Sequence, residues 1–281
     1  MHYLFEPLQY AFMQRAMVGT VAVGVLCAVL GAFVVLKKIA FIGEGLAHGS
    51  LAGLALGYLF HADLYLAGNL YTAALALLIG FLHQKVRVSF DVAIGIIFSA
   101  SMALGVALIS SMKFYTTDLT GYLFGSVLSI SSTDLRIMLV GTGVILLLTF
   151  LFYKELVFCA FDEEMAEVSG IPRTFLHYLL LAMIATAVVI ASQTVGIILV
   201  TALLITPAAA AYQLTARLER MISIAVGISL LSSLSGLYAS FYLNIASGAS
   251  IALSATFLFV IAYIFSPKRK PLGKSLGFKQ R

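Results

Sequence analysis

Long apolar runs separated by short polar segments dominate the chain, and they predict helices that cross a membrane. A spanning helix needs about 20 mostly apolar residues, and uncharged runs at 16–36, 64–82 and 92–112 reach that length. The uncharged runs at 178–216 and 221–267 are too long for one crossing, so each predicts a helical hairpin. We therefore predict an all-α, polytopic integral membrane protein.

The pattern predicts eight to nine transmembrane helices, with nine as the upper figure. The spans are expected at 14–36, 42–60, 64–82, 91–111, 136–153, 175–192, 195–213, 221–243 and 246–265. A further stretch around 113–135 is too polar and too interrupted by glycine for a plain span. That stretch predicts a short re-entrant or surface helix.

Composition agrees with a membrane protein, and the absence of catalytic motifs argues against an enzyme. The 281 residues are 62% hydrophobic and 10% charged, whereas a soluble domain carries about 25% charged residues. The two cysteines, Cys27 and Cys159, make neither a disulfide framework nor a ligand pair. No Walker A, His-Glu-x-x-His or Gly-x-Ser-x-Gly motif occurs. Energy for uphill transport would have to come from another subunit or from an ion gradient.

Basic residues predict the orientation, because cytoplasmic loops carry an excess of Lys and Arg. With the N-terminus outside and the C-terminus inside, 14 of the 17 Lys and Arg residues face the cytoplasm. Only Arg15, Lys113 and Arg136 then lie outside. The segment 267–281 becomes a basic cytoplasmic tail, and the net charge of +5 needs no nucleic-acid partner.

Glu44 and His48 are the candidate metal ligands, because both are ionisable and both lie inside the second predicted span. Each costs roughly 2.5–3.5 kcal/mol in the bilayer core, so such residues face a cavity or a partner. Residues four apart share one helix face, and His48 lies about 15 Å along the helix from Lys38, near the middle of a ~30 Å slab. Carboxylate and imidazole suit a divalent cation.

A second explanation of this pair is a Glu–His hydrogen bond that fixes helix packing. Two ligands do not complete a metal coordination sphere. A symmetric dimer with this helix at its axis would supply two Glu and two His side chains.

The loop at 154–173 predicts a short amphipathic helix at about 161–171. Asp162 is a plausible N-cap, and Gly170 can end the helix. The segment is either a solvated connector or a docking helix for a cytoplasmic partner, with an apolar stripe inside an acidic rim. The residues predicted to form this docking surface are Asp162, Glu163, Glu164, Met165, Glu167, Val168 and Gly170.

Four stretches, at 36–53, 118–130, 161–172 and 195–210, make the chain resemble a known family. It resembles the membrane permease subunits of the zinc, manganese and iron ABC importers. The resemblance implies a homodimeric or paired permease, cytoplasmic ATP-binding subunits and an extracytoplasmic metal-binding protein. It matches Glu44 and His48 to the ion-coordinating pair of the pore, where many members have Asp at the first position. The loop at 162–172 matches the coupling helix of the family.

The predicted protein is therefore a single permease domain over 1–266, in a prokaryotic inner or cytoplasmic membrane. It moves zinc, manganese or iron as substrate, without a permanently bound cofactor and without its own ATPase site. Thr206 and Pro207, in the seventh predicted span, are candidates for a kink near the ion path, although a static kink is the alternative.

Two other classes compete with this prediction. An ion-gradient-driven secondary transporter would usually show paired broken helices and its own coupling carboxylates, yet Glu44 is the one acidic residue deep in a predicted span. An intramembrane enzyme would need a nucleophile–base pair or a full metal triad, and the sequence offers neither.

Overall fold

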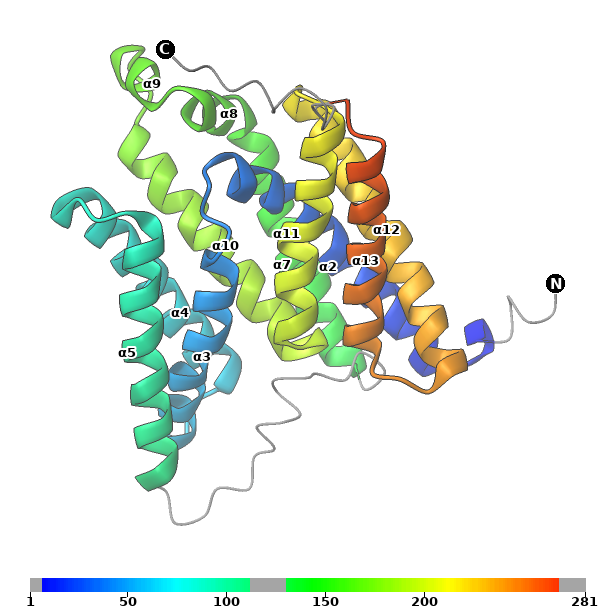
Figure 1. Ribbon diagram of the computed structural model, residues 1–281. Coiled ribbons are helices and arrows are strands. Elements are labelled where there is room, and N and C mark those ends of the chain that lie inside the picture. The colour runs from blue at the N-terminus through cyan, green and yellow to red at the C-terminus, as the bar shows by residue number, and fades with distance from the viewer. Residues whose placement is uncertain (1–6, 112–129, 268–281) are drawn as a thin grey trace, which may run out of the picture.

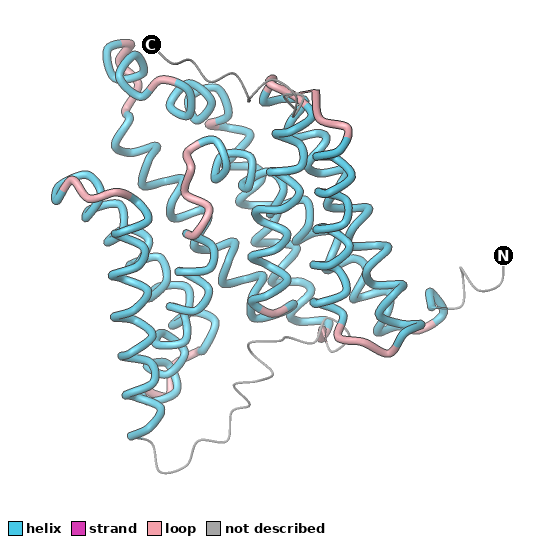
Figure 2. Tube along the Cα trace, in the orientation of Figure 1, coloured by secondary structure: helices cyan, strands magenta, loops and turns pink. Residues whose placement is uncertain are grey.

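The computed structural model describes residues 7–111 and 130–267, and this part of the chain is helical with no strand (Figures 1 and 2). The all-α prediction is confirmed. The elements are η1 (Pro7–Gln9), α2 (Ala11–Leu36), α3 (Ile42–Leu59), α4 (Leu64–Phe81), η2 (Leu82–Val86), α5 (Phe90–Ser111), α7 (Ser132–Leu151), α8 (Tyr153–Phe161), α9 (Glu163–Val168), α10 (Arg173–Val195), α11 (Ile197–Leu214), α12 (Leu218–Leu243) and α13 (Ser247–Ile264).

Eight of the described helices are long and apolar enough to cross a membrane, namely α2, α4 with its continuation η2, α5, α7, α10, α11, α12 and α13. Helix α3 has 18 residues but is not among the eight. Its sequence carries Glu44, His48 and several glycines, which lower its mean hydropathy. It nevertheless runs beside α4 and α5 within the bundle (Figure 1). The prediction of eight to nine spans is confirmed.

The long helices alternate in direction, so α2 begins on one face of the bundle and α13 ends on the opposite face (Figure 1). Helices α8 and α9 and the start of α12 share a face with the α2–α3 and α4–α5 connections. These segments, together with the start of α10, contain Lys37, Lys38, Lys85, Arg87, Lys154, Arg173, Arg217 and Arg220. The two remaining Lys and Arg residues of the described part of the chain, Arg15 and Arg136, lie near the starts of α2 and α7, which begin on the other side.

Several predicted boundaries were wrong by a few residues. Helix α7 begins at Ser132 and not at 136, because Ser131 and Asp134 form a capping box: the Asp134 amide donates to Ser131 Oγ (3.1 Å), and the Ser131 amide donates to Asp134 Oδ2 (3.2 Å). The end of the predicted surface segment 113–135 therefore belongs to a spanning helix. Residues 113–129 of that prediction, and the basic tail from 268, lie outside the described residues. The predicted turn at 192–195 is instead one residue, Gly196, with φ 91°.

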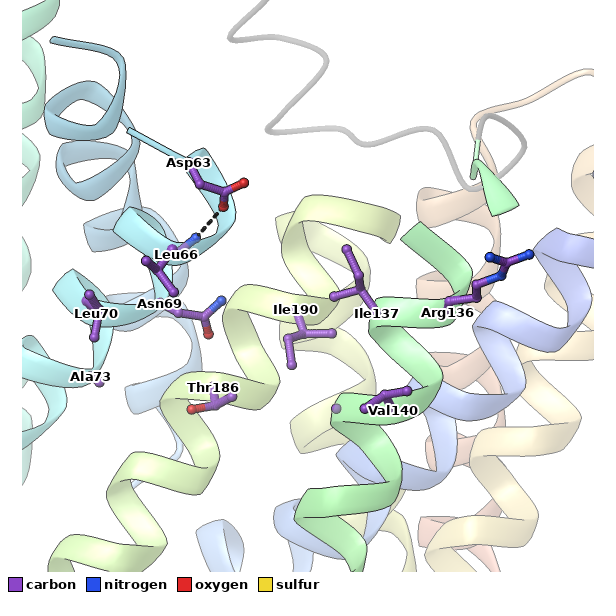
Figure 3. A pocket seen from close by; sticks show the side chains of 11 residues that line it. Asp63, Leu66, Asn69, Leu70, Ala73, Arg136, Ile137, Val140, Thr186 and Ile190 are labelled. Carbon is purple, nitrogen blue, oxygen red and sulfur yellow. Dashed lines mark hydrogen bonds between the residues drawn. The ribbon is translucent and has the colours of Figure 1, made fainter. Parts of the chain in front are cut away.

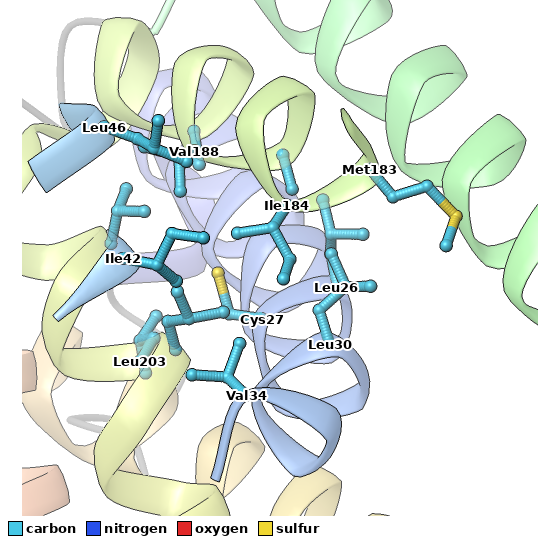
Figure 4. Close-up of a cluster of buried hydrophobic side chains, with 14 of the residues drawn as sticks. Leu26, Cys27, Leu30, Val34, Ile42, Leu46, Met183, Ile184, Val188 and Leu203 are labelled. Carbon is cyan, nitrogen blue, oxygen red and sulfur yellow. The ribbon is translucent and has the colours of Figure 1, made fainter. Parts of the chain in front are cut away.

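Small residues let the helices approach closely, as packing without a hydrophobic driving force between helices requires. A Cβ at Gly31 of α2 would overlap the backbone carbonyl of Leu204 in α11. Ser229 of α12 donates a hydrogen bond to the Gly24 carbonyl (2.9 Å). At the centre of the bundle, Figure 4 shows buried side chains from α2, α3, α10 and α11 meeting, among them Leu26, Cys27, Leu30, Val34, Ile42, Leu46, Ile184, Val188 and Leu203.

Candidate metal centre

Helix α3 is anchored to its neighbours by a glycine stripe in which every fourth residue is glycine: Gly45, Gly49, Gly53 and Gly57. Ideal Cβ atoms at these positions would lie 2.6–2.8 Å from side-chain atoms of α4 or α5, so no larger residue fits without movement. The sequence analysis did not identify this stripe. The signal was available as a repeated Gly-x-x-x-Gly pattern, which marks close helix packing in membranes.

Glu44 and His48 lie on the side of α3 that turns away from the core. Residues two apart on a helix point about 160–200° from each other. Ile42 and Leu46 are fully buried, and Glu44, between them, is exposed. His48, one turn further on, is half-buried. The structure therefore places the two predicted ligands on one face, at the edge of the α3 packing.

The His48 ring is oriented by two contacts. Its Nδ1 lies 3.2 Å from the Glu44 carbonyl oxygen. Because a carbonyl oxygen only accepts, Nδ1 carries a proton and donates, and Nε2 is the ring nitrogen outside this contact. Phe98 of α5 meets the ring edge-on, with centroids 5.9 Å apart and planes at 85°. Such an outer contact fixes which imidazole nitrogen binds a metal.

The described residues do not form a complete coordination sphere around Glu44 and His48. Within residues 7–111 and 130–267, no group of three or more His, Cys, Asp and Glu side chains is placed to hold a metal ion. Within this part of the chain, Glu44 and His48 are therefore a pair of candidate ligands on one helix face, without a third such side chain beside them.

The short amphipathic helix predicted at about 161–171 is present as the shorter helix α9 (Glu163–Val168), and its ends follow the predicted chemistry. Asp162 Oδ1 accepts a hydrogen bond from the Met165 amide (2.9 Å), as an N-cap does. Gly170 has φ 79°, and the Ile171 amide donates to the Ala166 carbonyl (3.0 Å), which closes a Schellman motif. Helix α8, directly before it, was not predicted.

The outer surface of α9 combines apolar and acidic residues. Met165 is 56% and Val168 84% exposed. Glu164 and Glu167 are exposed beside them, and Glu167 pairs with Arg173 (3.3 Å). The surface has the composition predicted for a docking helix.

Pro207 and Thr206 lie inside α11, where Pro207 is buried and Thr206 half-buried. One turn earlier, a Leu204 methyl carbon lies 2.7 Å from the ideal Cβ position of Gly43. The proline turn of α11 is therefore close to the first turn of α3, which carries Glu44.

A separate cleft of about 660 Å³ lies between α4, α7 and α10 (Figure 3). Its walls are mostly apolar, and its lining includes neither Glu44 nor His48. The cleft is therefore distinct from the candidate ligands. Its lining residues are Asp63, Leu66, Asn69, Leu70, Ala73, Arg136, Ile137, Val140, Gly141, Thr186 and Ile190.

Comparison with known proteins decides the family. The sequence model of the ABC 3 transport family matches residues 9–266, which is nearly the whole chain. The chain belongs to the ABC 3 transport family.

Curated relatives of this ABC 3 transport protein are named for metal transport. It is 43% identical over 269 residues to the "Manganese transport system membrane protein MntC" of Listeria monocytogenes, covering 96% of each chain. It is 37% identical over 266 residues to a Haemophilus influenzae membrane protein named for iron transport, covering 94% of each chain. Among solved structures, PsaBC from Streptococcus pneumoniae in complex with Fab matches with a TM-score of 0.84 and 34% identity, covering 95% of this chain and 96% of that chain.

This ABC 3 transport protein is therefore a permease subunit of a metal-type ABC importer, a transport component whose ATPase is a separate subunit. The predictions of its family, its general function and its lack of an ATPase site are confirmed. Membership of this family excludes the alternative of an ion-gradient-driven transporter, because ABC importers are driven by ATP.

Proposed function

We propose that this permease imports a divalent transition metal ion, with manganese as the first candidate, and that Glu44 and His48 bind the ion on its path. The observation that carries the proposal is the pairing of an exposed carboxylate with an imidazole one turn away. The imidazole is held so that Nε2 is the atom left to coordinate. Both residues lie on the one long described helix that lacks the apolarity of a simple span.

Manganese is favoured as the substrate by the names of the relatives, with iron second. Carboxylate and imidazole ligands accept either ion, and zinc as well. Zinc binds a given ligand set more tightly than manganese does. Selectivity for manganese therefore has to come from geometry or from the protein that delivers the ion.

A second copy of the permease is the proposed source of the remaining ligands. Glu44 is exposed in the single chain, although an unpaired carboxylate facing lipid is costly. A two-fold axis beside α3 would cover it and would bring together two Glu44 and two His48 side chains.

Two further partners follow from the two faces of the bundle. We place the face carrying α9 in the cytoplasm, because it holds most of the described Lys and Arg residues. The ATP-binding subunit then docks on α9 through Met165 and Val168, within the rim of Glu164 and Glu167. The opposite face, on which α2 begins, receives the extracytoplasmic metal-binding protein.

The test is uptake by the permease reconstituted in liposomes with its ATP-binding subunit and metal-binding protein. We expect ATP-dependent manganese uptake that an uncoupler does not abolish and that Glu44→Gln or His48→Gln reduces at least tenfold. Matched controls are Asp91→Asn, an exposed carboxylate in the first turn of α5, and His61→Asn, an exposed histidine just after α3. Wild-type uptake in both ligand variants would refute the assignment of the site.

A further inference from the structure

Three helices are joined by a chain of two hydrogen bonds next to His48. Ser101 Oγ of α5 donates to the backbone carbonyl of Gly49 in α3 (2.8 Å). The Tyr71 hydroxyl of α4 lies 3.1 Å from the same Ser101 oxygen. A serine hydroxyl has one proton, and that proton is already given to Gly49. Tyr71 must therefore be the donor, and the chain runs from Tyr71 through Ser101 to Gly49.

This pair of hydrogen bonds lies against the glycine stripe, with Ser101 buried and Tyr71 half-buried. Ser101 is 3% exposed. The ideal Cβ position of Gly53 lies 2.6 Å from Tyr71 Cβ, so the absence of a side chain at Gly53 is what lets Tyr71 approach α3. Hydroxyl chains of this kind strengthen each bond through polarisation in a low-dielectric environment.

Helix α5 contacts α3 at His48 and at the residue that follows it. Gly49 is the residue after His48, so the Ser101 bond fixes the helix turn from which His48 projects. Phe98, one turn before Ser101 on α5, meets the His48 ring itself at 85°. Helix α5 thus contacts both the His48 ring and the backbone of the next residue, Gly49, and the Tyr71 hydroxyl of α4 contacts Ser101.

We propose that Tyr71, Ser101 and Phe98 are positioning residues for His48, and that they set the affinity and selectivity of the permease for its metal. The proposal rests on the proposed function of Glu44 and His48. The same ligands bind zinc more tightly than manganese unless geometry prevents it. A rigidly held imidazole supplies such a geometric constraint, and loss of outer-shell partners typically lowers metal affinity 10–100-fold.

The experiment measures manganese uptake by the reconstituted importer with Tyr71→Phe, Ser101→Ala and Phe98→Leu. We expect KM for manganese to rise about tenfold or more, while kcat stays within about twofold of wild type. Zinc should inhibit manganese uptake at a lower ratio of zinc to manganese. Ser101→Thr keeps the hydroxyl, so its KM for manganese should stay near the wild-type value. Ser110→Ala is the matched control, because the Ser110 hydroxyl donates within its own helix, to the Ala107 carbonyl (2.9 Å).

A merely structural role would lower the amount of folded importer or kcat and leave KM and zinc inhibition unchanged, and that result would overturn the proposal. Tyr71→Phe removes one oxygen atom and carries the test if Ser101→Ala does not fold. Glu44→Gln and His48→Gln run in the same assay separate the two claims. If they transport normally, the proposed site fails. If they abolish uptake while the positioning variants keep wild-type KM, only the present inference fails.

Discussion

Replacing Gly53 by alanine tests whether the glycine stripe really holds α3 against α4. The added Cβ would lie 2.6 Å from Tyr71 Cβ, 3.0 Å from Cγ and 3.1 Å from Cδ1, where ordinary contact begins at 3.4 Å. The nearest of these atoms belongs to the stem of the Tyr71 side chain, so the helices have to separate by close to 1 Å. Overpacking of this kind costs about 1–3 kcal/mol, against a gain of about 0.5–1 kcal/mol for alanine in a helix.

The matched control is Gly95→Ala in α5, where nothing lies within 4 Å of the added Cβ. It has the same propensity gain and no clash, so the difference between the two variants isolates packing at about 1–3 kcal/mol. At roughly 2–4 °C per kcal/mol, Gly53→Ala should melt about 2–12 °C below Gly95→Ala. A thiol-reactive fluorophore reports the transition, because Cys27 and Cys159 are both buried thiols that form no disulfide. Equal melting temperatures would refute the packing argument.

Three further predictions concern other helices. Gly31→Ala should lower the melting temperature more than Gly227→Ala. A Cβ at Gly31 would overlap a backbone carbonyl that no rotamer change can move, whereas a Cβ at Gly227 has nothing within 4 Å. Equal melting temperatures would contradict the close approach of α2 and α11. Met165→Asp and Val168→Asp should weaken capture of the ATP-binding subunit without changing the melting temperature of the permease, because both side chains are mostly exposed; unchanged capture would exclude α9 as the docking surface. Pro207→Ala should lower the turnover number and leave KM for manganese unchanged, since it restores a helix hydrogen bond and Pro207 is not one of the candidate ligands. A raised KM would place Pro207 in the binding site.

Local sequence signals predicted most of the fold. Uncharged runs located the long helices, and the α9 caps followed from Asp162 and Gly170, whose roles depend on residues within a few positions. Boundaries were wrong where a cap was overlooked, as with Ser131 and Asp134 at the start of α7. These errors were of a few residues because each cap acts over a single turn.

The candidate ligands could also be predicted, because ionisable residues inside a span are rare and costly. Their surroundings could not. The bond from Ser101 to Gly49 joins residues 52 positions apart, and the contact of Tyr71 with Ser101 spans 30. Hydropathy carries no information on which small hydroxyl meets which carbonyl across two helices. Those partners became visible only once α4 and α5 were placed against α3.

The central claim, that His48 binds the transported ion, is tested most directly by pulsed electron paramagnetic resonance of Mn²⁺ bound to the importer. The sample is the permease with its ATP-binding subunit and without the metal-binding protein, so that no other metal site of the system contributes. We predict nitrogen coupling from an imidazole ligand in the wild type, loss of that coupling in His48→Gln, and its retention in His61→Asn. Nitrogen coupling that persists in His48→Gln, or that is missing from the wild type, would contradict the assignment.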